Sequence, residues 1–197
     1  ATTSPAMLFL SNIYNKPLIA NYLHAYIKSS NALANPFHVL WYKAPTLEPL
    51  NMPLDQYLDG EINELVLLRS SWTDPNATWI GMKSGVNSSP HAHLDLGNFE
   101  LEAGGVRWAK DLGSDDYNLD GYWTMGVNGK RWSYYRLNSF SHNVPLLGNK
   151  NQYELAKARF IQKELNVVNP SATLDLTEAY KDFSSKSTRK ISLADQR

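Results

Sequence analysis

The N-terminal part of the chain carries apolar positions at the spacing of an α-helix, interrupted by cap and proline signals. Ser4–Pro5 is typical of an N-cap followed by a proline in the first turn, and it predicts a first helix. Pro17 begins a second helix that ends near Ser29–Ser30. Asn35–Pro36 repeats the cap signal before a third helix over residues 37–42. A segment this short cannot bury so much apolar surface alone, so we expect these helices to pack against further helices.

Further along the chain, the pattern changes to short apolar runs separated by turn signals, which is typical of β-strands. A proline-rich stretch, residues 43–53, marks an irregular crossing between the two parts. Asp74–Pro75–Asn76 predicts a turn, and Gly104–Gly105 predicts a tight hairpin. Strands are predicted over residues 64–71, 78–82, 98–103, 106–110, 144–147, 157–161 and 190–193. The expected fold is mainly β: an antiparallel β-sandwich in residues 46–197, preceded by a few α-helices in residues 1–45.

Composition narrows the classes of function that this chain can have. The chain has 197 residues, of which 43% are hydrophobic, and this is enough to build a real core. Its formal net charge is zero, which gives no support to binding of nucleic acid through a broad basic field. There are no cysteines, so any metal ion must be held by histidine, aspartate or glutamate. No apolar run approaches the roughly 20 residues that cross a bilayer.

His91 and His93 form a His-x-His pair within a segment of strand-type residues. Side chains two residues apart on a strand point to the same face, so both imidazoles are expected on one face of the sheet. The predicted glycine hairpin places Asp111 roughly opposite Asn98, at the same end of the sheet as this pair. His142 follows in a later loop, and the spacing permits a site without by itself bringing the side chains together. Two histidines and one aspartate leave a coordination position open, which suits zinc or a similar divalent ion.

Several strings in this region carry a resemblance to a known family. Residues 88–117 read SSPHAHLDLGNFELEAGGVRWAKDLGSDDY, and residues 134–143 read YYRLNSFSHN, followed by Gly148 and Gln152. This combination resembles the signature of the heparinase II/III-like family of polysaccharide lyases, to which alginate and oligoalginate lyases of the same architecture are related. The strings EINELVLLRSSW (61–72), LDLTEAY (174–180) and RKISLAD (189–195) resemble strands of the same β-sandwich.

The resemblance implies an architecture and a reaction. Residues 1–45 would be the end of an N-terminal (α/α) toroid, and residues 46–197 would be a truncated C-terminal β-sandwich. The implied reaction is β-elimination on an acidic, uronic-acid-containing polysaccharide of the heparan sulfate or alginate type. A base removes the C5 proton and an acid protonates the leaving glycosidic oxygen. The catalytic tyrosine of such enzymes lies in the toroid, upstream of this chain, and the implied location is the bacterial periplasm or the outside of the cell.

The resemblance also implies roles for individual residues. His93, Asp111 and His142 match the positions that hold one structural zinc ion, and His91 matches a histidine that lines the catalytic cleft. Tyr135–Arg136 falls where the family has an aromatic–arginine pair, which implies substrate binding. The side chain of Asn143 is expected to orient the backbone.

Two other classes of function stay open. A non-catalytic carbohydrate-binding module fits the chain because the toroid residues are absent from it. A cupin-like metal oxygenase also uses a His-x-His pair in a β-fold, but Glu100 lies too far beyond His93 for the glutamate of that motif. Trp108, Trp123 and Trp132 are candidates for stacking on sugars, although tryptophan is more often a core residue.

Overall fold

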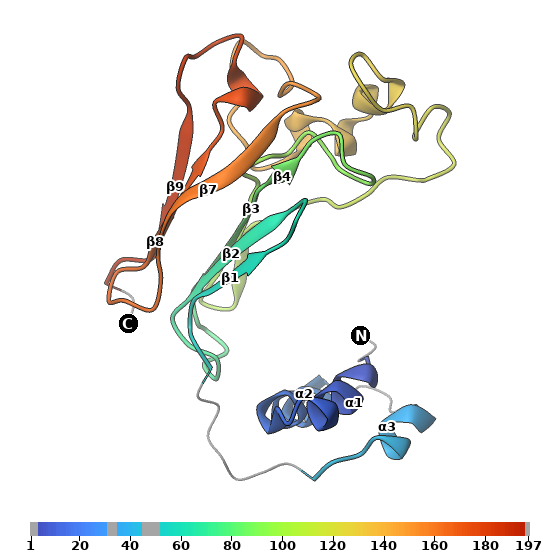
Figure 1. Ribbon diagram of the computed structural model, residues 1–197, viewed down its shortest axis with the longest axis vertical. Helices are drawn as coiled ribbons and strands as arrows, with labels where there is room; N and C mark the ends of the chain where they lie inside the picture. The colour runs from blue at the N-terminus through green and yellow to red at the C-terminus, as the bar shows by residue number, and fades with distance from the viewer. Residues whose placement is uncertain (1–3, 31–34, 45–51, 196–197) are drawn as a thin grey trace. The chain divides into compact units, whose positions relative to one another are not determined.

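The computed structural model describes residues 4–30, 35–44 and 52–195 (Figure 1). Its contacts divide the chain into two compact units, Ala1–Met52 and Pro53–Arg197. The first unit is helical and the second is built almost entirely from strands and loops.

The helical unit contains α1 (Ala6–Ile13), α2 (Pro17–Ser30) and α3 (Pro36–Leu40). The side chain of Asn35 caps α3 by accepting hydrogen bonds from the first backbone N–H groups of that helix, as predicted. The expected cap at Ser4 is wrong, because Pro5 takes the N-cap position of α1 without a side-chain hydrogen bond. In the part of the chain that the structure describes, no helix combines the length and apolar character needed to cross a bilayer.

The helical unit leaves much of its apolar surface uncovered. Its buried cluster is small and consists of Leu8, Ala20 and Leu23. Large apolar side chains that stay exposed are Phe9, Leu10, Ile13, Tyr14, Tyr22, Phe37, Val39, Leu40 and Tyr42. So large an exposed apolar surface is typical of an interface, which supports the expectation that these helices pack against others.

The second unit is an antiparallel β-sandwich, which confirms the predicted fold class. One sheet has the order β1-β2-β3-β5-β6, and the other has the order β4-β7-β8-β9. The first sheet is formed by β1 (Gln56–Asp59), β2 (Glu64–Arg69), β3 (Trp79–Lys83), β5 (Phe99–Ala103) and β6 (Val106–Ala109). The second is formed by β4 (Gly85–Val86), β7 (Lys157–Glu164), β8 (Ser171–Asp175) and β9 (Thr188–Ser192). Figure 1 shows β7, β8 and β9 as one layer and β1, β2 and β3 as another.

The core lies between the two sheets and follows the alternation of each strand. Val66 and Leu68 of β2 are fully buried in it, together with Met82 of β3. The second sheet contributes Ala158, Phe160, Ala172, Leu174 and Ile191. Leu65 and Leu67 alternate with the core residues of β2, so they lie on the opposite face of the first sheet. This second face is only partly buried, and it carries the site described below.

Two details of the predicted strand pattern are wrong. His91 and His93 do not lie on a strand but in the loop between β4 and β5. Residues 144–147 form no strand either, and Pro145 within them has no N–H to donate to a sheet. The predicted hairpin is confirmed: Gly104 and Gly105 both have positive φ angles, as a tight turn between two strands requires.

Candidate metal centre and adjoining cavity

Two loops that are far apart in the sequence pair with each other and bring His93 next to His142. The backbone N–H of Leu94 donates to the carbonyl of Leu137 at 3.0 Å. The Ser139 hydroxyl donates to the carbonyl of Leu94 at 2.7 Å. Both leucines are fully buried, which anchors the paired loops to the protein. As a result, the imidazole ring centres of His93 and His142 lie 5.1 Å apart.

Asp111 follows the end of β6 and joins this pair. Its carboxylate accepts a hydrogen bond from the Asn98 side chain at 2.7 Å, which confirms that the hairpin sets these two residues opposite each other. The same oxygen, Oδ2, lies 2.6 Å from Nδ1 of His142. Asn143 holds the adjacent backbone, because its side chain donates to the carbonyl of Phe99 at 2.9 Å. The expected role of Asn143 in orienting the backbone is thereby confirmed.

The electrostatics of these groups favour metal coordination. Burial opposes ionisation of Asp111, but hydrogen bonds from His142, Gly113 and Asn98 outweigh it and hold the pKa of this carboxyl well below its usual range. Burial lowers the pKa of His93 to about 4, so its imidazole is neutral near neutral pH. The His142 side chain is fully buried, and its Nε2 has no hydrogen-bond partner. An imidazole nitrogen without a hydrogen-bond partner is available as a metal ligand.

Asp95 is a second carboxylate within reach of the two histidines. One ligand atom each from His93, Asp95 and His142 lie within 4.8 Å of one another. Oδ1 of Asp95 forms an ion pair with Nζ of Lys83 at 2.6 Å. His93 and His142 with one of the two aspartates therefore offer nitrogen and oxygen donors that suit zinc or a similar divalent ion.

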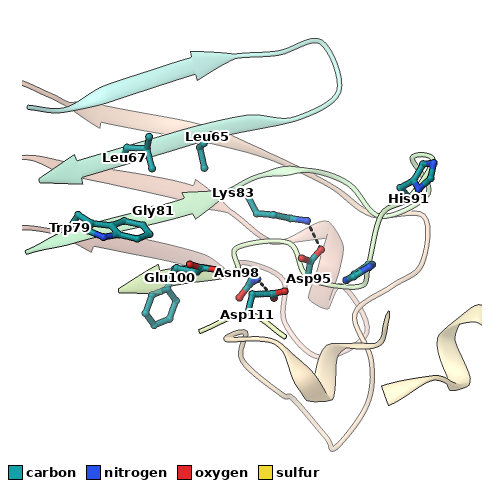
Figure 2. A pocket seen from close by; sticks show the side chains of 12 residues that line it. Leu65, Leu67, Trp79, Gly81, Lys83, His91, Asp95, Asn98, Glu100 and Asp111 are labelled. Carbon is teal, nitrogen blue, oxygen red and sulfur yellow. Dashed lines mark hydrogen bonds and ion pairs between the residues drawn. The ribbon is translucent and has the colours of Figure 1, made fainter. Parts of the chain in front are cut away.

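A cavity of about 400 Å³ adjoins these donors on the partly buried face of the first sheet (Figure 2). Figure 2 shows Leu65, Leu67 and Trp79 at one end, and the Lys83–Asp95 pair at the other. Asp111 also lines the cavity. Its volume and its mixture of apolar and charged walls are typical of a small-molecule or sugar-binding site.

His91 lies at the edge of this cavity rather than beside His93. Figure 2 shows its ring well apart from Asp95 and Asp111. The expectation that both imidazoles share one face is therefore wrong, because the backbone of His91 has φ of +63° instead of a strand conformation. The His91 ring packs against Trp123, with ring centres 4.9 Å apart. His91 is thus placed to meet a ligand in the cavity but not to coordinate with His93.

Sequence reasoning missed the residue that holds this loop. Arg131 is completely buried, and its Nε and Nη2 donate to the carbonyl of Ala92 at 3.1 and 2.9 Å. Its Nη1 donates to the carbonyl of Tyr122 at 2.9 Å. The guanidinium carbon also lies 4.5 Å from the ring centre of Tyr122. Arginine is rarely buried, so nothing in the sequence around Arg131 marked it as a core residue.

Arg131→Lys is expected to lower the free energy of unfolding of the β-sandwich unit by about 2 kcal/mol, because buried carbonyls lose their donors. A single ammonium group cannot reach both carbonyls with the geometry of a planar guanidinium. Urea unfolding measures the change, and Arg159→Lys is the matched control, because half-exposed Arg159 also bonds to backbone carbonyls. Equal stability of both variants would show that Arg131 does not hold the loop.

Tyr135 and Arg136 lie on the surface of η2 (Tyr135–Leu137). Nη1 of Arg136 donates to the carbonyls of Leu112 and Ser114 at 3.1 and 3.2 Å, so this arginine ties down the loop after Asp111. Neither residue is among the described residues that line the cavity. Their expected role in substrate binding stays a prediction.

The sequence and the fold of this chain are similar to those of known proteins. A scan of protein families matches residues 66–196 with the family described as heparinase II/III-like, C-terminal. Among solved structures, a heparinase III gene product is 20% identical with a TM-score of 0.63, and the match covers 98% of this chain and 26% of that chain. A heparan sulfate lyase HepC mutant from Pedobacter heparinus is 22% identical with a TM-score of 0.61, covering 99% of this chain and 26% of that chain. No curated protein matches the sequence.

The solved structures share the fold of this chain, which spans about a quarter of their length. The family match runs from β2 to the end of β9 and includes the loops that carry His93, Asp111 and His142. It covers well over half of the chain. This chain therefore belongs to the heparinase II/III-like family and contains its C-terminal domain.

Proposed function

We propose that this chain is the C-terminal part of a polysaccharide lyase that cleaves uronic-acid-containing glycans by β-elimination. In this proposal it supplies the metal-bearing wall of the cleft. The observation that carries the proposal is the convergence of His93, Asp111 and His142 beside a cavity whose edge is formed by His91. Heparan sulfate-like and alginate-like glycans are the substrate classes that we consider.

We infer that one zinc ion is held by His93, Asp111 and His142. The neutral imidazole of His93 fits this ion, and Oδ2 of Asp111 lies 2.6 Å from Nδ1 of His142. When bound, zinc would fix the two loops to the end of β6 and would act structurally rather than hydrolytically. Asp95 is an alternative carboxylate ligand, supported by its distance to the two histidines. In that arrangement Asp111 would orient His142 by accepting the proton on Nδ1.

The residues of this chain have limited roles in the proposed reaction. His91 would contact the sugar at the cleavage point and help to position or protonate it. Lys83 would place positive charge near the acidic groups of the glycan, although it is already paired with Asp95. The base that removes the C5 proton is proposed to be a tyrosine of the upstream toroid, with a pKa lowered by neighbouring charges.

The proposal includes a partner domain and a location. The exposed apolar side chains of the helical unit support packing against preceding helices of an (α/α) toroid. The small share of the solved structures that this chain covers also supports a longer parent protein. A polysaccharide lyase of this kind would work in the bacterial periplasm or outside the cell, where its substrate is found.

A lyase assay tests the proposal by following the ultraviolet absorbance of the unsaturated uronide product. We expect a longer protein that joins this chain to its toroid to release this product from heparan sulfate or alginate. We expect the isolated chain to release little or none. If the longer protein binds these glycans but releases no unsaturated product, the chain belongs to a non-catalytic carbohydrate-binding protein instead.

The cupin-like alternative receives no support from the geometry. A cupin-like centre needs both members of the His-x-His pair as ligands. Among the residues that the structure describes, the donor group contains His93 without His91.

A further inference from the structure

We propose that Tyr117, Trp123 and His91 form an aromatic platform that binds one sugar ring of the glycan next to the cavity. This inference rests on the proposed function, since it assumes that a glycan occupies the cavity. It adds a binding subsite formed by the long loop between β6 and β7.

The rings of the aromatic platform contact one another and share a buried base. The ring centres of Tyr117 and Trp123 are 5.2 Å apart, and those of His91 and Trp123 are 4.9 Å apart. Tyr122 lies beneath them, with its ring centre 5.0 Å from that of Tyr117 and 4.9 Å from that of Trp123. Tyr122 is fully buried, whereas Tyr117 and Trp123 are each 48% exposed. The rings of Tyr117 and Trp123 are therefore exposed to solvent, and the buried ring of Tyr122 packs against both of them.

The backbone below the aromatic platform is held by a series of turns. The N–H of Tyr122 donates to the carbonyl of Leu119 at 3.0 Å, and the N–H of Thr124 donates to the carbonyl of Gly121 at 2.9 Å. Arg131 then bonds the carbonyl of Tyr122 and, on its other side, that of Ala92 beside His91. One buried guanidinium thus ties both sides of the aromatic platform together. A binding surface ordered in advance loses little conformational entropy when a ligand binds.

The chemistry of the aromatic platform favours a sugar ring as its ligand. A pyranose presents C–H groups on one face and hydroxyls around its rim, and the C–H face matches the electron-rich face of an indole or phenol. His91 connects the two sites, because it lines the cavity and also packs against Trp123. A glycan that occupies the cavity and continues past His91 would place its next sugar ring on Trp123 and Tyr117.

Binding of oligosaccharides to the complete 197-residue chain tests this inference. The probes are a heparan sulfate-derived tetrasaccharide and an alginate-derived tetrasaccharide. Nuclear magnetic resonance detects even weak binding through the indole N–H signals of the six tryptophans, with Trp123 assigned from the spectrum of Trp123→Phe. We expect the Trp123 signal to shift on titration. We expect Trp123→Ala to bind about tenfold more weakly, the effect of losing one aromatic anchor.

Further variants serve as controls and as independent tests. Phe183→Ala removes an aromatic ring that is 41% exposed and is not among the described residues that line the cavity, and its affinity should equal that of the wild type. Trp123→Phe keeps an aromatic ring and should recover most of the affinity, provided that circular dichroism shows each variant folded. In a His91→Ala background, Trp123→Ala should still weaken binding, because Trp123 itself contacts the sugar. Tyr117→Ala gives an independent test if Trp123→Ala does not fold.

The outcomes separate the two proposals. If the wild type binds a tetrasaccharide but Trp123→Ala and Tyr117→Ala bind it equally well, the aromatic platform is wrong and the proposed function stands. The same conclusion follows if Trp123→Ala has no effect in the His91→Ala background, since Trp123 would then only position His91. If the wild type binds neither tetrasaccharide, the aromatic platform and the proposed glycan specificity are both wrong.

Discussion

His142→Ala is expected to weaken binding of Zn²⁺ to this chain by more than about 100-fold, which exceeds the usual effect of losing a group that only supports a ligand. The reason lies in the position of the side chain. His142 is fully buried, its Nε2 has no other partner, and its Nδ1 contacts Asp111. Alanine would remove the nitrogen donor and also the group that orients Asp111. Isothermal titration with Zn²⁺ and elemental analysis of the purified protein measure the loss.

His24→Ala is the matched control for this experiment. His24 lies on α2 in the helical unit, where its Nε2 contacts the carbonyl of Lys43 at 2.6 Å. Its replacement should leave zinc binding unchanged, whereas His93→Ala should behave like His142→Ala. Equal zinc content in all of these variants would show that the ion is bound elsewhere or not at all.

The same titration decides which aspartate is the ligand. If Asp111 coordinates the ion, Asp111→Asn should reduce affinity by more than about 100-fold and Asp95→Asn by less. The opposite order would assign the ligand role to Asp95 and a supporting role to Asp111. The family resemblance favours Asp111, whereas the distances between donor atoms favour Asp95, because both oxygens of Asp111 already accept hydrogen bonds and only Oδ1 of Asp95 is paired.

Glu64→Ala is expected to lower the free energy of unfolding of the β-sandwich unit by about 3 kcal/mol, the upper end of the usual cost of leaving buried hydrogen-bonding groups without a partner. Glu64 is buried and links strands of both sheets. Its carboxylate accepts hydrogen bonds from the Tyr57 hydroxyl at 2.5 Å, the Ser84 hydroxyl at 3.0 Å and the Phe160 N–H at 2.9 Å. Alanine would leave the Ser84 hydroxyl and the Phe160 N–H without this buried acceptor, and the partly buried Tyr57 hydroxyl would lose it as well. Chemical unfolding measures the loss, and Glu61→Ala, at an exposed position, should change stability by less than about 0.5 kcal/mol.

The stabilisation of the folded protein by Glu64 should also decrease as the pH falls. Burial opposes ionisation of Glu64, but the hydrogen bonds from Tyr57, Phe160 and Ser84 outweigh it and hold its pKa below the usual value in the folded protein. A lowered pKa means that the stabilisation is fully present above the unfolded-state pKa of about 4.3 and is lost as pH falls through the folded-state value. The stability difference between wild type and Glu64→Ala should therefore narrow on acidification below about pH 4. A difference that grows on acidification would contradict this account.

Local patterns in the sequence predicted those parts of the site that depend on one hairpin. Gly104–Gly105 sets the register of β5 and β6, and this register brings Asp111 to Asn98. The adjoining loops could not be predicted in the same way. The strand-type residues around His91 and His93 predict that both imidazoles lie on one face of a strand. In the structure this segment is a loop, and hydrogen bonds from Leu94 to Leu137 and from Arg131 to Ala92 hold it there.

Local patterns were enough to predict the fold class and the division into an N-terminal helical unit and a larger β-rich unit. Both depend on periodicity and on turn residues, which act over a few positions of the chain, whereas the family resemblance rests on specific strings of residues. The folded structure was needed to show that His93 meets His142, that His91 packs against Trp123, and that Arg131 is buried between their loops. These contacts join residues about 30 to 50 positions apart. No local preference can encode them, because each contact joins segments that are distant in the sequence.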